Sequence, residues 1–233
     1  LLFVDRNEHG PLPLSRLKQL KLMPVMVTSN YQLERNELTE KWFAATQGET
    51  PLKGSVSLGY DRSTKGTLEV LPLDIALGET TNLQFSGMNF DIAASDQAEQ
   101  IKVSGGMDSL RLSTLSGDAT TPIRLELRDL QIDSDRQLGE SGFYLGTDNA
   151  TLESAELRYG KEPPLLLKSL SQSASAQESD SNLSASIGYD IGMISYGGQE
   201  IGSAQLGWSL KNLDIQASRS LFKLYQAKLE ALQ

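Results

Sequence analysis

Hydrophobic and polar residues alternate with a period of two along much of the chain. One face of the extended segment 25–33 carries Val25, Val27, Ser29, Tyr31 and Leu33. The same alternation runs through residues 56–60 and 183–191. It is typical of strands with one packed face and one solvated face, as in antiparallel sheets. The sequence therefore predicts a mainly β (α+β) protein with a large, curved, mostly antiparallel sheet and few short helices.

The alternation slips by one residue at similar places in several segments. One such segment has its apolar residues at Leu83, Phe85, Met88, Phe90 and Ile92. The slip recurs within residues 68–77, 123–132 and 206–215, and in a weaker form within 165–170. An extra residue reverses the facing of every following side chain unless the strand bulges or bends. We therefore predict a bulge or sharp bend near Pro72, Gly87, Asp129 and Asn212.

The slips return at intervals of about 40 residues. The first residues after four of them are Met88, Leu130, Leu170 and Leu213, which lie 42, 40 and 43 residues apart. This spacing fits a structural repeat of two or three strands per unit, and coincidence in a strand-rich chain is the alternative. Alternation alone fits an open sheet, a sandwich and a barrel.

Two segments have helical periodicity. Residues 36–46 place Leu38, Trp42 and Phe43 on one side. After Ser218, a candidate N-cap, residues 219–233 carry a stripe formed by Leu221, Tyr225, Leu229 and Leu232. We expect this terminal amphipathic helix to pack on the sheet, with a partner-binding or coiled-coil role as the alternative.

The stretch from Lys168 to Ser186 is rich in serine. We interpret it as a polar edge strand that leads into a mobile hairpin loop. The 233 residues are expected to form a single β-rich domain that ends in the helix 219–233. Because residue 1 is Leu rather than Met, we also expect the sequence to be an excised fragment or a processed product of a longer protein.

Composition removes several classes of function. The chain has 21 basic and 30 acidic residues and a net charge of −9, which argues against nucleic acid as a partner. It has no cysteine and one histidine, so thiolate chemistry, disulfides and two-histidine metal sites are excluded. We expect no cofactor and no metal. No apolar stretch of about 18 residues suggests a membrane span within the sequence.

Few residues suggest chemistry. His9 would need a nearby nucleophile to act as a base, whereas beside Gly10 and Pro11 it fits a tight turn. Two acidic pairs, Asp133 with Asp135 and Glu153 with Glu156, could serve a carboxylate-dependent hydrolase, and a solvated strand face is the simpler interpretation. Trp208 falls on the apolar face of its segment, which favours core packing. We therefore assign no catalytic residue.

The motif Glu8-His9-Gly10-Pro11-Leu12-Pro13, followed by Leu17, resembles the His-Gly-Pro signature of the bacterial YdgA-like family, whose biochemical function is unknown. The extended segments that end in residues 210–214 before a helix are similar to the central region of that family. The resemblance implies a Gram-negative cell-envelope protein, anchored in the inner membrane by a segment outside this sequence, with this region in the periplasm. The C-terminal part of the family would also be absent. His9, Gly10 and Pro11 mark the family and carry no assigned role.

These observations lead to three functional hypotheses. The first is a non-enzymatic periplasmic domain whose β-sheet serves as a binding or scaffolding platform for lipid or another envelope component. The second is a hydrolase that uses paired carboxylates on envelope material. The third is an oligomerisation module, in which the terminal helix or an edge strand makes the contact of a homo-oligomer.

Overall fold

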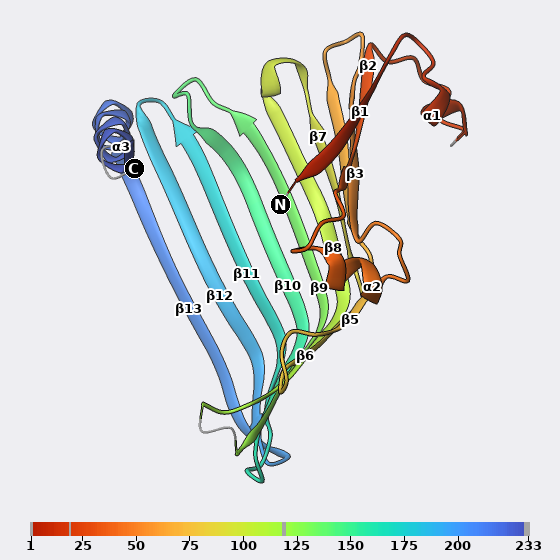
Figure 1. Cartoon of the computed structure of the whole chain (residues 1–233). Coiled ribbons are helices and arrows are strands. Elements are labelled where there is room, and N and C mark those ends of the chain that lie inside the picture. Colours follow the sequence, from red (N-terminus) through yellow and green to blue (C-terminus); the bar gives the residue numbers. More distant parts are fainter. Residues whose placement is uncertain (1, 19, 118–119, 231–233) are drawn as a thin grey trace.

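The strands form one open antiparallel sheet. The computed structural model describes residues 2–18, 20–117 and 120–230 (Figure 1). Of the thirteen strands in these residues, eleven follow the chain across the sheet in the order β1-β2-β3-β4-β7-β8-β9-β10-β11-β12-β13, while β5 pairs with β6 and β6 with β8. The predicted fold class, mainly β with a large antiparallel sheet, is confirmed. Of the arrangements that the alternation allows, the sheet adopts the open one.

The elements fall into two groups. The first comprises β1 (Phe3–His9), α1 (Leu14–Lys18), β2 (Val27–Leu33), α2 (Glu40–Ala45), β3 (Leu52–Leu58), β4 (Thr64–Val70), β5 (Leu73–Ala76), β6 (Asn82–Phe85), β7 (Met88–Ala94) and the 3₁₀ turn η1 (Asp96–Ala98). The second comprises the long strands β8 (Gln100–Leu115), β9 (Pro122–Leu138), β10 (Tyr144–Tyr159), β11 (Leu165–Ser179), β12 (Asn182–Tyr196) and β13 (Gln199–Asp214), followed by α3 (Ile215–Glu230).

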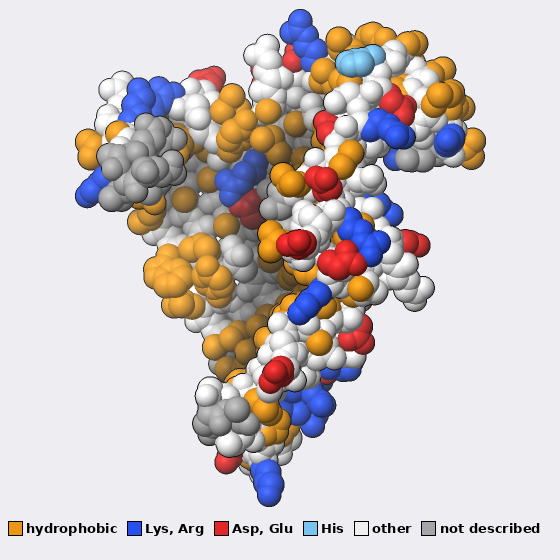
Figure 2. Space-filling model, viewed as in Figure 1, with side chains coloured by type: hydrophobic (Ala, Val, Ile, Leu, Met, Phe, Trp, Pro, Cys, Tyr) orange, Lys and Arg blue, Asp and Glu red, His pale blue; other side chains and the backbone are white. Residues whose placement is uncertain are grey.

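The register places most apolar side chains of these strands on one face, called here the inner face. In β9 this face carries Ile123, Leu125, Leu127, Leu130 and Ile132. Leu125 lies opposite Leu112 of β8 and Leu157 of β10, so apolar rows run across the strands. The outer face of β9 carries Arg124, Glu126 and Asp133. Figure 2 shows the molecule hollowed between the α3 side and the β1–β4 side, with hydrophobic side chains along the hollow.

Neighbouring strands bend at one common level. The register of the long strands passes over one residue each in β8 to β12, namely Asp108, Asp129, Glu153, Ser169 and Gly192. Gly87 between β6 and β7, and Pro72 between β4 and β5, lie at the same level. Because each of these strands contributes its own extra residue, pairing resumes beyond the bend and the apolar residues stay on the inner face. We call this row the bend line.

The backbone confirms the predicted distortions. Gly87, Asp129 and Asn212 have φ values of 97°, 51° and 58°. Gly87 and Asp129 lie on alternate strands of the bend line, so the interval of about 40 residues corresponds to one β-hairpin. Asn212 belongs to a separate bulge near the end of β13, where Lys211 and Asn212 together oppose Ser184.

Only a small part of the sheet is covered by other elements. The buried hydrophobic residues among those described are Val25, Leu33, Phe43, Ile75 and Met107. Phe43 lies on α2, which contacts β5 and covers one corner of the inner face (Figure 1). α3 contacts the end of β13 and the β9–β10 turn, where Phe222 packs edge-on against Phe143.

Both predicted helices differ from the observed ones at their ends. α2 begins at Glu40 rather than at residue 36, because the Asn36 side chain accepts hydrogen bonds from the N–H groups of Leu38 and Thr39 and holds a turn there. α3 begins at Ile215, and its cap is Asp214, whose Oδ1 accepts the Ala217 N–H at 2.7 Å. The proposed cap Ser218 is therefore wrong. Leu232 and the side chain of Leu229 lie outside the described residues.

The serine-rich stretch is not an edge strand. β11 pairs with both β10 and β12, and β12 pairs with both β11 and β13. A two-residue turn, Asp180–Ser181, joins them. Ser171, Ser173 and Ser175 take outer-face positions of an interior strand, so their polarity reflects the solvated side of the sheet.

A substitution at Gly87 tests whether the bend line contributes to stability. A Cβ added there would lie 2.8 Å from the Val70 carbonyl oxygen, and its positive φ disfavours other residues. We expect Gly87→Ala to reduce the free energy of unfolding by about 1–3 kcal/mol, measured by urea denaturation. The control Gly78→Ala adds a Cβ that meets nothing within 4 Å, and it should change stability little. Equal stability of the two variants would contradict this role of Gly87.

Candidate binding surface

The protein exposes far more surface than its mass requires. Its accessible surface is 15577 Å² for 25.4 kDa. A compact monomer of this mass exposes about 10,300 Å². An excess of about half indicates a sheet that lacks a second layer over most of its area.

The inner face of β12 and β13 is the least covered part. Leu206, Trp208 and Leu210 follow one another on this face of β13 and are 51%, 54% and 59% exposed. Trp208 packs edge-on against Tyr189 of β12, with ring centroids 6.0 Å apart. The prediction that Trp208 lies in a core is therefore wrong: Trp208 is on the apolar face of its strand, but in the part of the chain that the structure describes no element covers it there.

The uncovered apolar surface continues over the other strands. Further exposed inner-face residues are Val56, Ile92, Leu157, Tyr159, Tyr196 and Leu213. On β9 the uninterrupted apolar stretch from Ile123 to Ile132 is about 30 Å long at the usual rise per residue. Contiguous apolar patches of this extent on soluble proteins mark binding surfaces.

A polar group ends the apolar stretch on β9 and β10. Ser134 and Arg136 continue the inner face of β9 beyond Ile132, and Asp148 lies opposite Ser134. The Asp148 Oδ1 accepts hydrogen bonds from the Ser134 hydroxyl (2.5 Å) and from the Arg136 Nε (2.9 Å), and Arg136 also forms an ion pair with Asp148. Their mutual neutralisation leaves a polar but uncharged end to the apolar strip.

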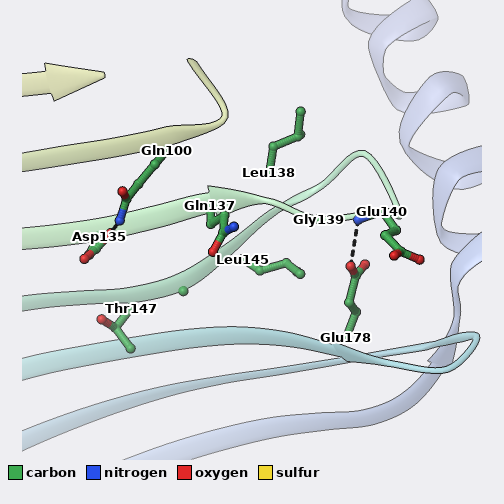
Figure 3. A pocket seen from close by; sticks show the side chains of 10 residues that line it. Gln100, Asp135, Gln137, Leu138, Gly139, Glu140, Leu145, Thr147 and Glu178 are labelled. Atoms are coloured by element: carbon green, nitrogen blue, oxygen red, sulfur yellow. Dashed lines mark hydrogen bonds between the residues drawn. The ribbon is translucent and has the colours of Figure 1, made fainter. Parts of the chain in front are cut away.

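A polar pocket of about 590 Å³ lies at the β9–β10 turn (Figure 3). Asp135, Glu140 and Glu178 are its acidic residues, and Glu178 of β11 accepts the N–H groups of Glu140 (2.7 Å) and Ser141 (3.0 Å). The Arg219 side chain of α3 donates to the carbonyl oxygens of Glu140 and Ser141. Hydrogen bonding from the Ser141 side chain, and then from the Ser141 and Glu140 N–H groups, lowers the pKa of Glu178, and the charge of Arg219 lowers it further. Glu178 and Arg219 together fix the turn, which gives this carboxylate a structural role.

The acidic pairs suggested by the sequence do not converge. Asp133 and Asp135 lie on the exposed outer face, where Asp135 contacts Lys102 at 2.9 Å. Glu153 lies about 13 Å farther along the neighbouring strand, four residues beyond the partner of Asp133. Its pKa is raised by the adjacent Asp129 carboxyl. Glu156 forms an ion pair with Arg158. The paired geometry that a hydrolase needs is therefore not found at these four residues.

The His9-Gly10-Pro11 motif lies where β1 ends. His9 is exposed and pairs with Val27. Gly10 has a φ of 113°, and its N–H donates to the Met26 carbonyl. Glu8 accepts hydrogen bonds from the N–H and the hydroxyl of Ser15, in the first turn of α1. The motif thus directs the chain from β1 into α1.

The described residues hold neither a metal-ion cluster nor a membrane-spanning helix. In the described ranges, no group of three or more His, Asp or Glu side chains is placed to hold a metal ion. None of the helices in the part of the chain that the structure describes has both the length and the apolar character needed to cross a bilayer.

Sequence reasoning did not identify the residues that close the apolar strip or fix its turn. Arg136 and Asp148 are 12 residues apart, and Glu178 lies 37 residues from Ser141. The sequence offered one signal for Arg136: the alternation assigns this charged residue to the apolar face of β9.

The Glu178 interaction predicts a pH dependence of stability. Because the folded-state pKa is below the ordinary value of 4.5, the interaction stabilises the protein above that pH and is lost as the pH falls through the folded-state value. We expect Glu178→Gln to lower the urea midpoint at neutral pH and to converge with the wild type in acid. Glu37→Gln, at an exposed position, is the control. A constant difference between Glu178→Gln and the wild type at all pH values would contradict the assignment.

Comparison with known proteins gives relatives without an assigned activity. The family model described as "Bacterial protein of unknown function (DUF945)" matches residues 1–233. The chain is 25% identical over 234 residues to Protein YdgA of Escherichia coli K12, covering 100% of this chain and 46% of that protein. It is 22% identical over 229 residues to the uncharacterized protein YihF of the same organism, covering 96% and 45%.

A third relative is an uncharacterized protein of Haemophilus influenzae, 36% identical over 83 residues, covering 36% of this chain and 21% of that protein. The chain spans about half the length of the E. coli relatives. No solved structure matches it.

Proposed function

The chain belongs to the DUF945 family of bacterial proteins of unknown function, and we propose from its structure that the inner face binds the acyl chains of lipids. The observation that carries the proposal is the uncovered apolar face in a protein with about half as much surface again as its mass requires. Binding rather than catalysis is proposed, since no catalytic arrangement was found at the candidate residues.

The chemistry of the face favours an acyl chain over a peptide. The strand backbones of the interior of the sheet are already paired in ladders, so the inner face offers a peptide few hydrogen-bonding groups. An acyl chain needs none and gains about 0.8 kcal/mol for each methylene removed from water.

The dimensions also fit. One leaflet of a bilayer has a hydrocarbon depth of about 15 Å, half of the whole core. The apolar stretch of β9, about 30 Å long, therefore accommodates an extended acyl chain lying along the strands. Ser134, Arg136 and Asp148 would meet the polar group of the lipid at one end.

The proposal includes a place in the cell. We place the domain in the periplasm, on a protein anchored in the inner membrane by a segment outside this sequence, as the resemblance to the YdgA-like family implies. An aqueous compartment between two membranes is one in which a lipid needs an apolar protein surface to leave the bilayer.

Trp208 provides a direct test of lipid binding. In a Trp42→Phe variant, Trp208 is the remaining tryptophan, and it lies on the inner face. We expect fatty acids or phospholipids brominated in their acyl chains to quench its fluorescence, whereas non-brominated lipids should not. Absence of quenching by any brominated lipid would contradict the proposal.

Matched variants of β13 locate the site. Leu206→Ser with Leu210→Ser should weaken binding at least tenfold, because burial of one leucine contributes about 2 kcal/mol. Gln205→Ala with Ser209→Ala changes the outer face of the same strand and should leave the affinity unchanged. Since all four side chains are exposed, neither variant should prevent folding.

A second candidate function is self-association through β13. This strand has 16 residues, and within the described ranges it pairs on one side only, with β12. Such an edge can add a strand from another chain. Light scattering over a range of concentrations should then give a dimer, and a monomer throughout would contradict this alternative.

A further inference from the structure

The segment that joins β1 to β2 combines exposed apolar and basic side chains. It is closed at its base by hydrogen bonds from the Gly10 N–H to the Met26 carbonyl (3.2 Å) and from the Val25 N–H to the Pro11 carbonyl (3.1 Å). Between Pro11 and Met26 the sequence has three basic residues and no acidic one, in a chain whose net charge is −9. Its exposed hydrophobic residues include Leu14, Leu20, Leu22 and Met23, with Leu20 84% and Met23 72% exposed.

A basic pocket lies between this segment and the outer face of the sheet. Its volume is about 700 Å³. The basic residues that line it are Arg16 and Lys21 from the segment, Lys65 from β4 and Lys102 from β8, and its one carboxylate is Asp91 of β7. The register Ser57–Lys65–Ala93–Lys102 forms one row across four strands and so places the two sheet lysines about 10 Å apart on the pocket floor.

Part of this positive charge is not neutralised within the protein. Lys102 pairs with Asp135, but Lys21 and Lys65 form no ion pair with any of the described residues. Arg16 donates to the Ser57 hydroxyl (3.2 Å) and to the Met23 carbonyl (3.2 Å). Its Nε is buried and has no hydrogen-bond partner. An orphaned guanidinium N–H in a basic pocket calls for an anionic acceptor.

We propose that this pocket binds the phosphate of an anionic phospholipid at a membrane surface, while the exposed leucines and Met23 enter the bilayer interface. A phosphate would satisfy the charge of Lys21 and Lys65, and the Arg16 guanidinium also lines the pocket. A free phosphate would account for the pocket but not for the exposed leucines beside it. Apolar side chains flanked by Lys and Arg are typical of surfaces that lie in the membrane interface.

The pocket is separate from the acyl-chain surface, because its floor is the outer face of the sheet. The proposal therefore does not depend on what the inner face binds. Figure 1 places α1 at the same end of the sheet as α3, and Figure 2 shows hydrophobic, Lys and Arg side chains gathered at the α1 end. Membrane contact there would bring one end of the inner face close to the bilayer.

Vesicle sedimentation tests the inference. We expect the wild-type chain to bind vesicles of phosphatidylcholine with phosphatidylglycerol, and to bind pure phosphatidylcholine vesicles much more weakly. Lys21→Gln with Lys65→Gln should weaken binding to the anionic vesicles about thirtyfold, since each basic residue near such a surface contributes about a factor of five. Leu22→Ser with Met23→Ser should also weaken it. Circular dichroism verifies that each variant is folded.

The controls separate this site from general electrostatics and from a soluble anion site. Lys161→Gln with Lys211→Gln removes the same charge outside the pocket and should leave vesicle binding nearly unchanged; an equal loss would overturn the proposal. Calorimetric titration with inorganic phosphate tests whether the pocket binds a soluble anion instead. Phosphate binding without any vesicle binding would also overturn it, in favour of a soluble anion. Leu206→Ser with Leu210→Ser, on the inner face, should retain vesicle binding.

Discussion

The structure depends on one unmet requirement: a sheet with an apolar face normally needs a second layer, and this one has almost none. Ladder hydrogen bonds satisfy the backbone, but they do nothing for the side chains of the inner face. α2 covers one corner of that face, where it contacts β5, and Phe43 of α2 and Ile75 of β5 are buried there. Among the described residues no comparable element covers the inner face from β7 to β13, and the hollow seen in Figure 2 is the consequence. In the proposed function, bound acyl chains supply this missing layer.

The asymmetry between the faces arises from hydrophobic patterning rather than from charge. Most ion pairs of the sheet, such as Lys53–Glu69 and Lys102–Asp135, are exposed on the outer face and contribute little each. Arg136–Asp148 is different because it lies on the inner face and is half-buried. There it limits the apolar strip. Polar residues thus keep the outer face solvated, and on the inner face they set the length of the apolar strip.

Much of the fold could be predicted because alternation and its slips are local properties. The strands and the distortions at Gly87, Asp129 and Asn212 follow from which residues are apolar, and the register confirms them. The number of layers could not be predicted, since Trp208 has the same pattern whether or not another element covers it. The interior position of the serine-rich strand was missed for a related reason: a solvated face and a solvated edge have the same composition. The basic pocket joins Arg16 to Ser57, 41 residues away, and such pairings appear only with the folded sheet.

The bend line determines which insertions and deletions the sheet can accept. Each strand that crosses it contributes one extra residue, so the hydrogen-bond registers above and below stay matched between neighbours. Deleting that residue from a single strand would disrupt two ladders at once, whereas inserting a whole hairpin of about 40 residues with its own extra residues would disrupt none. The fold is thus tolerant of duplication and intolerant of single-residue loss, a bias that would let such sheets widen by copying hairpins while their curvature is preserved.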